Sequence, residues 1–256
     1  MSETRARLPG RALVSSGDVL VVIPARFGST RLPGKALAPI AGRPMVLHVA
    51  DRVLEGGLEP VVATDDPRIQ AVCQQAGVAV ELTSPEHPSG SDRVWEAAQR
   101  FPKARWVINV QGDEPLFDGS VLLEMVALLR EGRAPVVTLG APLPDDEGAL
   151  QDPSVVKVQV GPDGLAVDFT RSSPPAGVAH ATLQHLGCYG FGRAALGHFV
   201  SLPPSSRELR ERLEQLRLVQ AGVPIAVLSI DQASPSVDTP SDLERVRALM
   251  GVRPQE

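Results

Sequence analysis

The chain has 256 residues, of which 43% are hydrophobic and 21% charged, and its net charge is −5. This composition excludes a wholly disordered chain, because such a chain lacks the apolar surface that offsets the entropy lost on folding. The negative charge, without a basic patch, argues against nucleic acid as a partner. No apolar run approaches the roughly 20 residues that cross a bilayer, so we expect no membrane insertion.

The cysteines and the first residues indicate where the protein works. Cys73 and Cys188 are isolated, without zinc-binding spacing, and two thiols make no disulfide framework. We therefore expect the reducing cytoplasm. Residues 1–17 lack the apolar stretch of a signal peptide and are interpreted as a mobile N-terminal tail outside the fold.

From residue 18 onward, apolar runs alternate with segments of helical periodicity. The first run ends at Pro24 and is apolar throughout, as expected of a strand buried on both faces. This alternation, with short connections, predicts an α/β fold with a doubly wound, mostly parallel sheet. The predicted strands are 19–23, 60–63, 78–82, 106–110 and 135–139, and the predicted helices are 44–54, 66–76, 91–100 and 120–130.

The second half is richer in predicted strands. Residues 161–164, GPDG, separate two apolar runs and are typical of a hairpin turn. A helix is expected to begin at Ser205, which has capping-box spacing with Glu208. We predict one domain over 18–256, with a smaller β-rich lobe inserted at about 153–222. The expected strands are 155–160, 165–169, 186–191 and 225–230, the closing helix is 240–250, and Leu209, Leu213 and Leu216 are expected to form one apolar stripe on the helix after Ser205.

Ligands of an open parallel sheet bind outside the carboxyl ends of its strands. The segment from Pro24 to Lys35, here called the cationic loop, follows the first strand and also carries Arg26 and Arg31. Its glycines let backbone N–H groups approach a phosphate, and its cations neutralise the charge. The loop is neither a Walker A nor a GxGxxG motif. It therefore predicts a phosphate site, with an ordinary cationic surface loop as the alternative.

Two acidic residues follow other predicted strands. Asp113 lies in the QGDEP turn, and Asp238 precedes a helix that we expect Thr239 to cap and Pro240 to begin. Asp238 is then free of capping. One Mg²⁺ ion, which takes few protein oxygens plus substrate phosphates, could bind both carboxylates. The alternative for Asp113 is a turn aspartate that hydrogen-bonds its own backbone.

These three segments, IPARFGSTRLPGK, NVQGDEP and VDTPSDLERVR, together resemble the 3-deoxy-manno-octulosonate (Kdo) cytidylyltransferases, or CMP-Kdo synthetases. Supporting matches are GRPMVLHV, VATDD, HPSGSDRV, VKVQV, QHLG and LEQLR, and the resemblance covers about Val19 to Met250. It implies a nucleotide-diphospho-sugar transferase-like fold. It also implies the reaction CTP + Kdo → CMP-Kdo + pyrophosphate, a step of lipopolysaccharide synthesis, in a protein that is typically a homodimer.

The resemblance also implies residue roles. Arg26, Lys35, Asp113 and Asp238 match catalytic positions, and Asp113 and Asp238 match the Mg²⁺ ligands. No histidine lies beside QGDEP, so no side chain is assigned as the base. The matched nucleotide-binding residues are Pro24, Ala25, Arg26, Arg31, Lys35, Ser89, Gly90 and Asp113. The matched sugar-binding residues are Arg93, Gln111, Arg171, His185, Tyr189, Glu214 and Gln215.

Alternatives remain on the sugar side. Glu214 sits among alternating charges typical of a solvated helix face, and His185 could be a core histidine. Between Arg171 and His185 the chain reads SSPPAGVAHATLQ, where the family carries a longer, charged and aromatic stretch. The sugar acid could therefore be 8-amino-Kdo or a sialic-type acid. A non-catalytic nucleotide-binding module is the third hypothesis, since fold alone does not give function.

Overall fold

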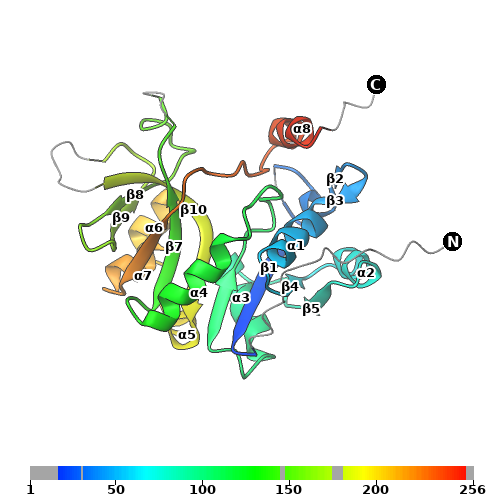
Figure 1. Ribbon diagram of the computed structural model, residues 1–256, viewed down its shortest axis with the longest axis horizontal. Helices are drawn as coiled ribbons and strands as arrows, with labels where there is room; N and C mark the ends of the chain where they lie inside the picture. Colours follow the sequence, from blue (N-terminus) through cyan, green and yellow to red (C-terminus); the bar gives the residue numbers. More distant parts are fainter. Residues whose placement is uncertain (1–16, 30, 145–147, 175–180, 252–256) are drawn as a thin grey trace.

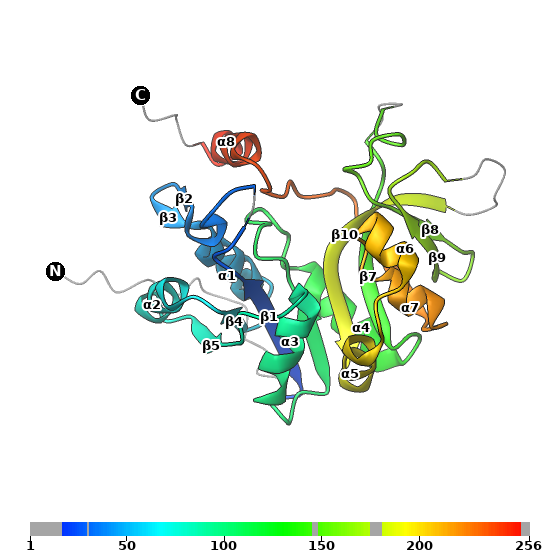
Figure 2. The same ribbon diagram turned by 180° about the vertical axis from the view of Figure 1, so that it is seen from behind.

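The computed structural model describes residues 17–29, 31–144, 148–174 and 181–251. In this part of the chain a nine-stranded sheet forms the centre, with the order β11-β7-β10-β6-β1-β4-β5; β8 pairs with β10, and β9 pairs with β8 (Figure 1). Helices lie on both faces of the sheet, and Figure 2 shows the molecule from the side opposite to Figure 1. No helix within these residues is long and apolar enough to cross a membrane. The predicted N-terminal tail lies outside the described residues, Gly17 excepted.

The parallel half of the sheet consists of β1 (Val19–Ala25), β4 (Pro60–Thr64), β5 (Ala79–Leu82) and β6 (Trp106–Asn109). β1 lies between β6 and β4 and runs parallel to both, and β4 pairs in parallel with β5. β4 is buried throughout and β1 nearly so, because helices cover both faces. The prediction of these four strands is confirmed to within two residues at each end.

The helices of this half form two layers. α1 (Met45–Glu55), α2 (Pro67–Gln75) and α4 (Val121–Glu131) share one hydrophobic cluster with one face of the sheet. α3 (Gly90–Gln99) packs in a second cluster on the other face. All four predicted helices are confirmed. The two helical layers hold the sheet between them, and with it the strand ends from which the loops leave.

β10 (Ala181–Gly192) departs from the parallel pattern. It lies between β6 and β7 (Val136–Ala141) and runs antiparallel to both. β11 (Ile225–Ser229) then pairs in parallel with β7. Since only β10 opposes its neighbours along the seven-strand path, the prediction of a mostly parallel, doubly wound sheet is confirmed.

β8 (Lys157–Val160) and β9 (Ala166–Thr170) form the predicted hairpin and extend the sheet. β8 pairs with the first residues of β10, Ala181 to Gln184, whereas the last residues of β10 pair with β6. The residues that we expected to form an inserted lobe, 153–222, therefore include a strand of the central sheet. They also include α5 (Arg193–Ser201), which packs in the same cluster as α3.

The helix predicted to begin at Ser205 is present but short. Ser205 forms a capping box with Glu208 at the start of α6 (Ser206–Glu211). The helix ends at Arg212, whose φ of 54° lies in the left-handed region, and a separate helix, α7 (Leu216–Gln220), follows.

This break makes the predicted apolar stripe wrong. Leu209 is 67% exposed, whereas Leu213 and Leu216 are buried in the core. A left-handed residue turns the chain, so positions spaced for one helix face lie on different sides of the molecule.

Smaller elements connect the cationic loop to the end of the chain. The 3-10 helix η1 (Lys35–Leu37) and the short strands β2 (Pro39–Ile40) and β3 (Arg43–Pro44) follow the loop. α8 (Pro240–Leu249) begins as predicted, with Thr239 as its cap. A third hydrophobic cluster packs α8 against these elements, and its buried members are Ile40, Met45, Val237, Leu243 and Val246.

Candidate active site

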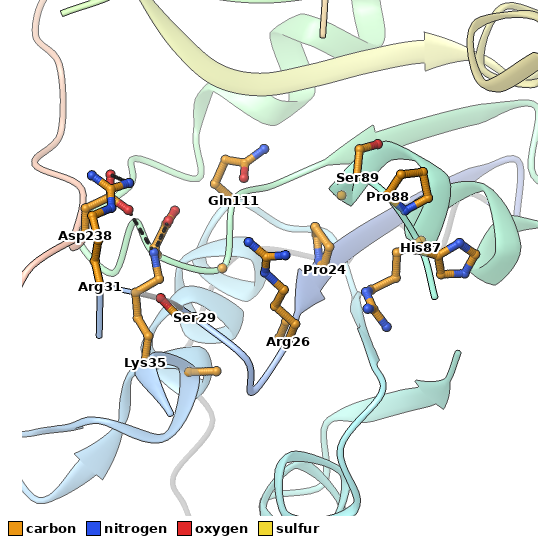
Figure 3. Close-up of a pocket in the computed structure, with 16 residues that line it drawn as sticks. Pro24, Arg26, Ser29, Arg31, Lys35, His87, Pro88, Ser89, Gln111 and Asp238 are labelled. Carbon is orange, nitrogen blue, oxygen red and sulfur yellow. Dashed lines mark hydrogen bonds and ion pairs between the residues drawn. The ribbon is translucent and has the colours of Figure 1, made fainter. Parts of the chain in front are cut away.

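A cavity of about 290 Å³ opens beyond the carboxyl ends of β1 and β6, where the sequence predicted a ligand (Figure 3). β1 and β6 are neighbours in the sheet, so the segments that follow them meet. The first turn of α3 and the segment before α8 complete the walls. The lining residues are Pro24, Ala25, Arg26, Ser29, Arg31, Lys35, Ala36, His87, Pro88, Ser89, Gly90, Arg93, Gln111, Gly112, Asp113 and Asp238.

Gly112 allows the two strand ends to approach each other. A Cβ at this position would lie 2.8 Å from the carbonyl oxygen of Pro24, so any side chain would push the segments apart. The Asp113 carbonyl oxygen accepts a hydrogen bond from Val237 N at 2.8 Å. These two contacts place Asp113 between the cationic loop and the segment that carries Asp238.

Lys35 joins the two carboxylates that were predicted to share a metal ion. Its Nζ donates to Asp113 Oδ2 at 2.6 Å and to Asp238 Oδ1 at 3.1 Å, while Arg31 Nη2 lies 3.1 Å from Asp238 Oδ2. Burial of the ammonium lowers the pKa of Lys35, but the two carboxylates outweigh burial and raise this pKa above its usual value. Lys35 is therefore a permanent cation at the point where both carboxylates meet.

The same carboxylates fit a hard divalent cation. Enzymes hold Mg²⁺ through one or two carboxylates together with substrate phosphates. Asp113 and Asp238 keep 25% and 39% of their side chains exposed, so both can reach a ligand in the cavity. Among the described residues, no group of three His, Cys, Asp or Glu could hold a metal alone. The donor set fits Mg²⁺ bound jointly with a phosphate-bearing molecule.

The N-terminus of α3 forms the wall opposite Lys35. Ser89 is its N-cap, and Ser89 Oγ accepts a hydrogen bond from Asp92 N at 3.3 Å. Arg26 lies between the Lys35 end and the Ser89 end of the cavity (Figure 3). Unpaired N–H groups at a helix N-terminus and a nearby guanidinium both favour an anion. All eight residues predicted to bind the nucleotide line this one cavity.

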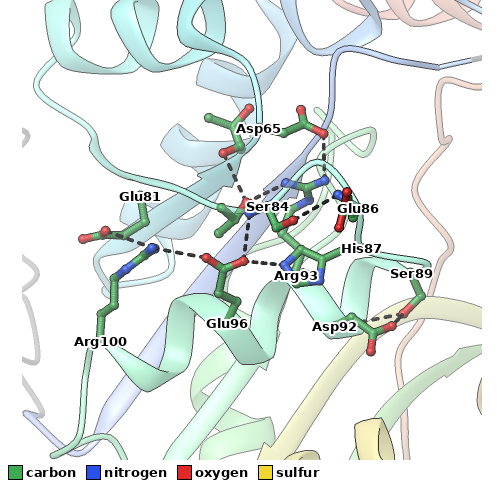
Figure 4. A network of polar contacts seen from close by, with 12 residues as sticks. Asp65, Glu81, Ser84, Glu86, His87, Ser89, Asp92, Arg93, Glu96 and Arg100 are labelled. Carbon is green, nitrogen blue, oxygen red and sulfur yellow. Dashed lines mark hydrogen bonds and ion pairs between the residues drawn. The ribbon is translucent and has the colours of Figure 1, made fainter.

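Arg93, predicted on the sugar side, lines the cavity in a fixed orientation. It is 4% exposed, and its guanidinium donates from Nη1 to Thr83 Oγ1 at 2.5 Å and from Nη2 to Asp65 Oδ2 at 2.8 Å (Figure 4). Asp65 follows β4 and was not predicted as a site residue, although it belongs to the VATDD match. Asp65 and Thr83 therefore set the direction of the Arg93 fork.

Gln111 connects the cavity to β10. Its Nε2 donates to the Gly187 carbonyl oxygen at 2.9 Å. A Cβ on Gly187 would lie 3.0 Å from Gln111 Cγ, so the absence of a side chain allows this close approach. Gln111 thus lies at the junction between the cavity and the strand that carries His185 and Tyr189.

His87 is a cavity residue that the sequence analysis missed. Its Nε2 lies 2.5 Å from Glu96 Oε2, and the same carboxylate accepts from Ser84 N at 2.8 Å (Figure 4). Burial raises the pKa of Glu96, but these hydrogen bonds and Arg100 outweigh burial and lower it below its usual value. The HPSGSDRV motif contains His87, but nothing in the motif indicated a chemical role for this histidine.

The other predicted sugar contacts do not line this cavity. Arg171 donates from Nε to the Glu211 carbonyl oxygen at 2.8 Å and from Nη1 to the Pro153 carbonyl oxygen at 2.9 Å. Its guanidinium therefore holds two backbone segments together. The residues that lie outside the cavity are Arg171, His185, Tyr189, Glu214 and Gln215.

His185 lies in the wall of a second cavity, of about 970 Å³, which shares Arg31 and Asp238 with the first. Its Nε2 is 3.0 Å from Thr138 Oγ1, and its ring packs edge-on against Phe169 with 4.9 Å between ring centroids. Burial lowers the pKa of His185 to about 3, so the imidazole is neutral at physiological pH. His185 is thus a held, uncharged group beside the carboxylate end of the first cavity.

Glu214 is tied to α3 and does not belong to a solvated helix face. Ser91 Oγ donates to Glu214 Oε1 at 2.8 Å. Burial raises the pKa of Glu214, and hydrogen bonds from Ser91 and Ser89 oppose the increase. The neighbouring Gln215 is 4% exposed, and Tyr189 on β10 is 5% exposed. The solvated-face alternative is therefore wrong for Glu214, which lies behind the Ser89 wall.

Comparison with known proteins places the chain among its relatives. A family model described as cytidylyltransferase matches residues 20–226. Two relatives named 3-deoxy-manno-octulosonate cytidylyltransferase are similar along nearly their whole length. The one from Azorhizobium caulinodans is 45% identical over 244 residues, which cover 92% of this chain and 97% of the relative. The one from Rhodospirillum centenum is 46% identical over 243 residues, covering 91% and 94%.

A solved structure gives the same result in three dimensions. The structure of CMP:2-keto-3-deoxy-manno-octonic acid synthetase complexed with CTP has a TM-score of 0.85 and 40% identity, and the match covers 91% of this chain and 98% of that chain. The family match includes the cationic loop, the QGDEP turn and the first turn of α3, which together form most of the cavity. On the combined evidence of sequence, fold and cavity, the chain belongs to the cytidylyltransferase family.

Proposed function

We propose that this chain is a 3-deoxy-manno-octulosonate cytidylyltransferase, which converts CTP and Kdo to CMP-Kdo and pyrophosphate. The observation that carries the proposal is that Asp113 and Asp238 both contact Lys35 in a cavity that the cationic loop lines. Relatives that are about 45% identical are named for Kdo, which supports Kdo as the sugar acid. A solved relative complexed with CTP supports CTP as the nucleotide.

The reaction joins two anions, so the protein must position them and offset their charge. The anomeric hydroxyl oxygen of Kdo forms a bond to the α-phosphorus of CTP. The bond from that phosphorus to the oxygen that bridges to the β-phosphate breaks, pyrophosphate leaves, and the hydroxyl proton passes to the solvent. Arg26, Arg31 and Lys35 are assigned to the triphosphate because they line one cavity and bring positive charge from one loop.

Asp113 and Asp238 are the proposed ligands of Mg²⁺. A bound ion offsets charge on the α-phosphate and lowers the pKa of a hydroxyl that coordinates it. Lys35 holds the two carboxylates at one point and offsets their mutual repulsion. The protein thereby keeps both ligands ready at the phosphate end of the cavity.

The sugar acid is proposed to lie between Arg93, Gln111 and the strand β10. A forked guanidinium suits the carboxylate of Kdo, and the fork of Arg93 is already oriented by Asp65. Glu214 contacts the first turn of α3 through Ser91, which supports its placement near this sugar. The other proposed members of the sugar site are Arg171, His185, Tyr189 and Gln215.

The family resemblance also supports proposals about the setting of the enzyme. We infer that it acts as a homodimer in the cytoplasm and supplies CMP-Kdo for lipopolysaccharide assembly. C₂ dimers are the commonest assembly of soluble proteins. Size-exclusion chromatography with light scattering should give a particle of two chains, and a 27.1 kDa particle would contradict the dimer.

The test of the reaction is a coupled assay for pyrophosphate with mass spectrometry of the sugar product. We expect pyrophosphate and CMP-Kdo in equal amounts when CTP, Kdo and Mg²⁺ are all present. Omission of either substrate, or chelation of the metal by EDTA, should abolish both products. A folded protein that binds CTP but forms no CMP-Kdo would contradict the proposal and favour a non-catalytic module.

A further inference from the structure

Phe27 shapes the first half of the cationic loop, directly after Arg26. Its carbonyl oxygen accepts hydrogen bonds from Ser29 N at 2.9 Å and from Gly34 N at 3.1 Å. The ring atoms Cε2 and Cζ would lie 3.1 and 3.2 Å from a Cβ on Gly34, whose φ is +70°. The edge of the ring therefore packs against the Gly34 backbone, one residue before Lys35, and joins the two ends of the loop.

Arg68, in the first turn of α2, covers the face of the same ring. Its guanidinium carbon lies 3.4 Å from the ring centroid of Phe27. Asp66 holds this guanidinium through both oxygens, since Arg68 Nε donates to Oδ1 at 2.9 Å and Nη2 donates to Oδ2 at 2.6 Å. A forked pair of this kind fixes the guanidinium in its position over the aromatic ring.

The sheet positions Asp66 beside the loop. β1 and β4 run parallel, and their last residues, Ala25 and Thr64, are opposite each other. Asp66 N donates to Thr64 Oγ1 at 3.2 Å, and Asp66 also caps α2. The base of this arrangement is therefore a rigid strand end next to the strand end from which the cationic loop leaves.

The loop needs such support because its cations repel one another. Arg31 and Lys35 pair with Asp238 and Asp113, and these ion pairs fix the second half of the loop. Arg26 is exposed and belongs to the first half, where the Phe27 contacts act. An aromatic ring under a fixed guanidinium supplies attraction there without placing a carboxylate where the triphosphate has to bind.

We propose that the Asp66–Arg68 pair is a positioning element that holds the cationic loop, through the ring of Phe27, in the shape that receives the triphosphate. The proposal rests on the function proposed above. Neither Asp66 nor Arg68 lines the cavity, so each acts through Phe27 and not by touching the nucleotide.

Steady-state kinetics with Arg68→Gln provide the first test. We expect KM for CTP to increase about fivefold, with kcat and KM for Kdo within twofold of the wild type, because only the nucleotide loop loses its support. Phe27→Leu should give the same change, and the double variant should be no worse than either single variant. Arg130→Gln is the matched control for the loss of charge, because Arg130 is exposed and pairs with Asp18 far from the loop.

Limited trypsin digestion without nucleotide tests the loop independently of catalysis. In Arg68→Gln, cleavage after Arg26 and Arg31 should be several-fold faster than in the wild type and in Arg130→Gln, as measured by mass spectrometry. Unchanged KM for CTP together with unchanged cleavage would overturn the positioning role, whatever happens to the melting temperature. If the wild type formed no CMP-Kdo but the cleavage difference remained, the proposed function would fail while the positioning role would stand.

Discussion

The proposed nucleotide side and the proposed sugar side of this molecule are organised differently. Every residue predicted to bind CTP lines one cavity at the carboxyl ends of β1 and β6, and six of the eight belong to the end of β1, the cationic loop or the turn after β6. The residues predicted for the sugar divide, since Arg93 and Gln111 reach that cavity while His185 lies in a second one. Local strand-end motifs thus assemble the cavity that is proposed to bind phosphate, whereas the proposed sugar site depends on segments joined through long-range pairing.

Loss of a carboxylate at the phosphate end should have the largest effect. Asp113→Asn keeps the size of the side chain but removes the charge that Lys35 contacts and that Mg²⁺ would require. We expect kcat to fall by about 10³-fold, with the melting temperature nearly unchanged. The measurement is pyrophosphate release at saturating CTP and Kdo. Asp118→Asn is the control, because Asp118 is exposed, lies outside the cavity and caps a turn that asparagine can also cap. Full activity of Asp113→Asn would show that Asp113 is not a ligand of the Mg²⁺ ion.

A substitution that separates the ends of β1 and β6 should have the next largest effect. Gly112→Ala places a Cβ 2.8 Å from the Pro24 carbonyl oxygen and must displace the QGDEP turn. A shift on the order of 1 Å at reacting groups costs about 10²-fold in rate. Gly17→Ala is the control, because Gly17 precedes β1, lies outside the cavity, and its Cβ would meet no atom within 4 Å. Equal kcat/KM values for the two variants would show that this close approach does not position Asp113.

The phosphate end was predictable because its information is local. Pro24 lies one residue before the end of a buried strand, and the cations follow within one loop. Asp238 was selected because Thr239 and Pro240 account for the helix start, which the structure confirms. What the sequence left open was the distance between Asp113 and Asp238, since only the packing of the chain brings both to Lys35.

The sugar side was harder to predict because it depends on contacts between distant segments. No periodicity reveals that β10 would enter the sheet antiparallel between β6 and β7. The left-handed Arg212 ended a helix that apolar spacing had extended through Leu216. Glu214 follows this turn and contacts Ser91. The alternating charges suggested a solvated helix face only because one continuous helix was assumed.

A substitution on the sugar side should separate the two regions kinetically. Glu214→Gln keeps a hydrogen-bond acceptor for Ser91 Oγ but removes the carboxylate charge. We expect KM for Kdo to increase about tenfold while KM for CTP stays within twofold, a loss typical of one hydrogen bond to a charged group. Glu244→Gln, on the exposed side of α8, is the matched control. An increase in KM for CTP alone would assign Glu214 to the nucleotide side.

The smallest expected effect is a decrease in the free energy of unfolding at low pH. His185 has a pKa of about 3 in the folded protein, below its unfolded value of about 6.5. Above pH 6.5 the group is neutral in both states and contributes nothing. As the pH falls from 6.5 towards 3, only the unfolded state takes up the proton, so the free energy of unfolding decreases by about 1.4 kcal/mol for each pH unit.

His185→Gln keeps a donor for Thr138 Oγ1 and removes this titration. Urea unfolding of both proteins at pH 7.5 and 5.5 should show a decrease that is about 1 kcal/mol larger for the wild type. Parallel pH profiles of the two proteins would show that the imidazole is not buried in its neutral form.

Whether the cavity binds CTP and the protein activates Kdo is best measured with a panel of sugar acids and CTP. Initial rates of pyrophosphate release would be measured with Kdo, 8-amino-Kdo and sialic acid, and again with UTP, ATP or GTP in place of CTP. We predict the highest kcat/KM for the pair CTP and Kdo, with at most trace rates for the other nucleotides. A higher kcat/KM with another sugar acid, or no release from CTP and Kdo by folded protein, would show that the protein is not a Kdo cytidylyltransferase.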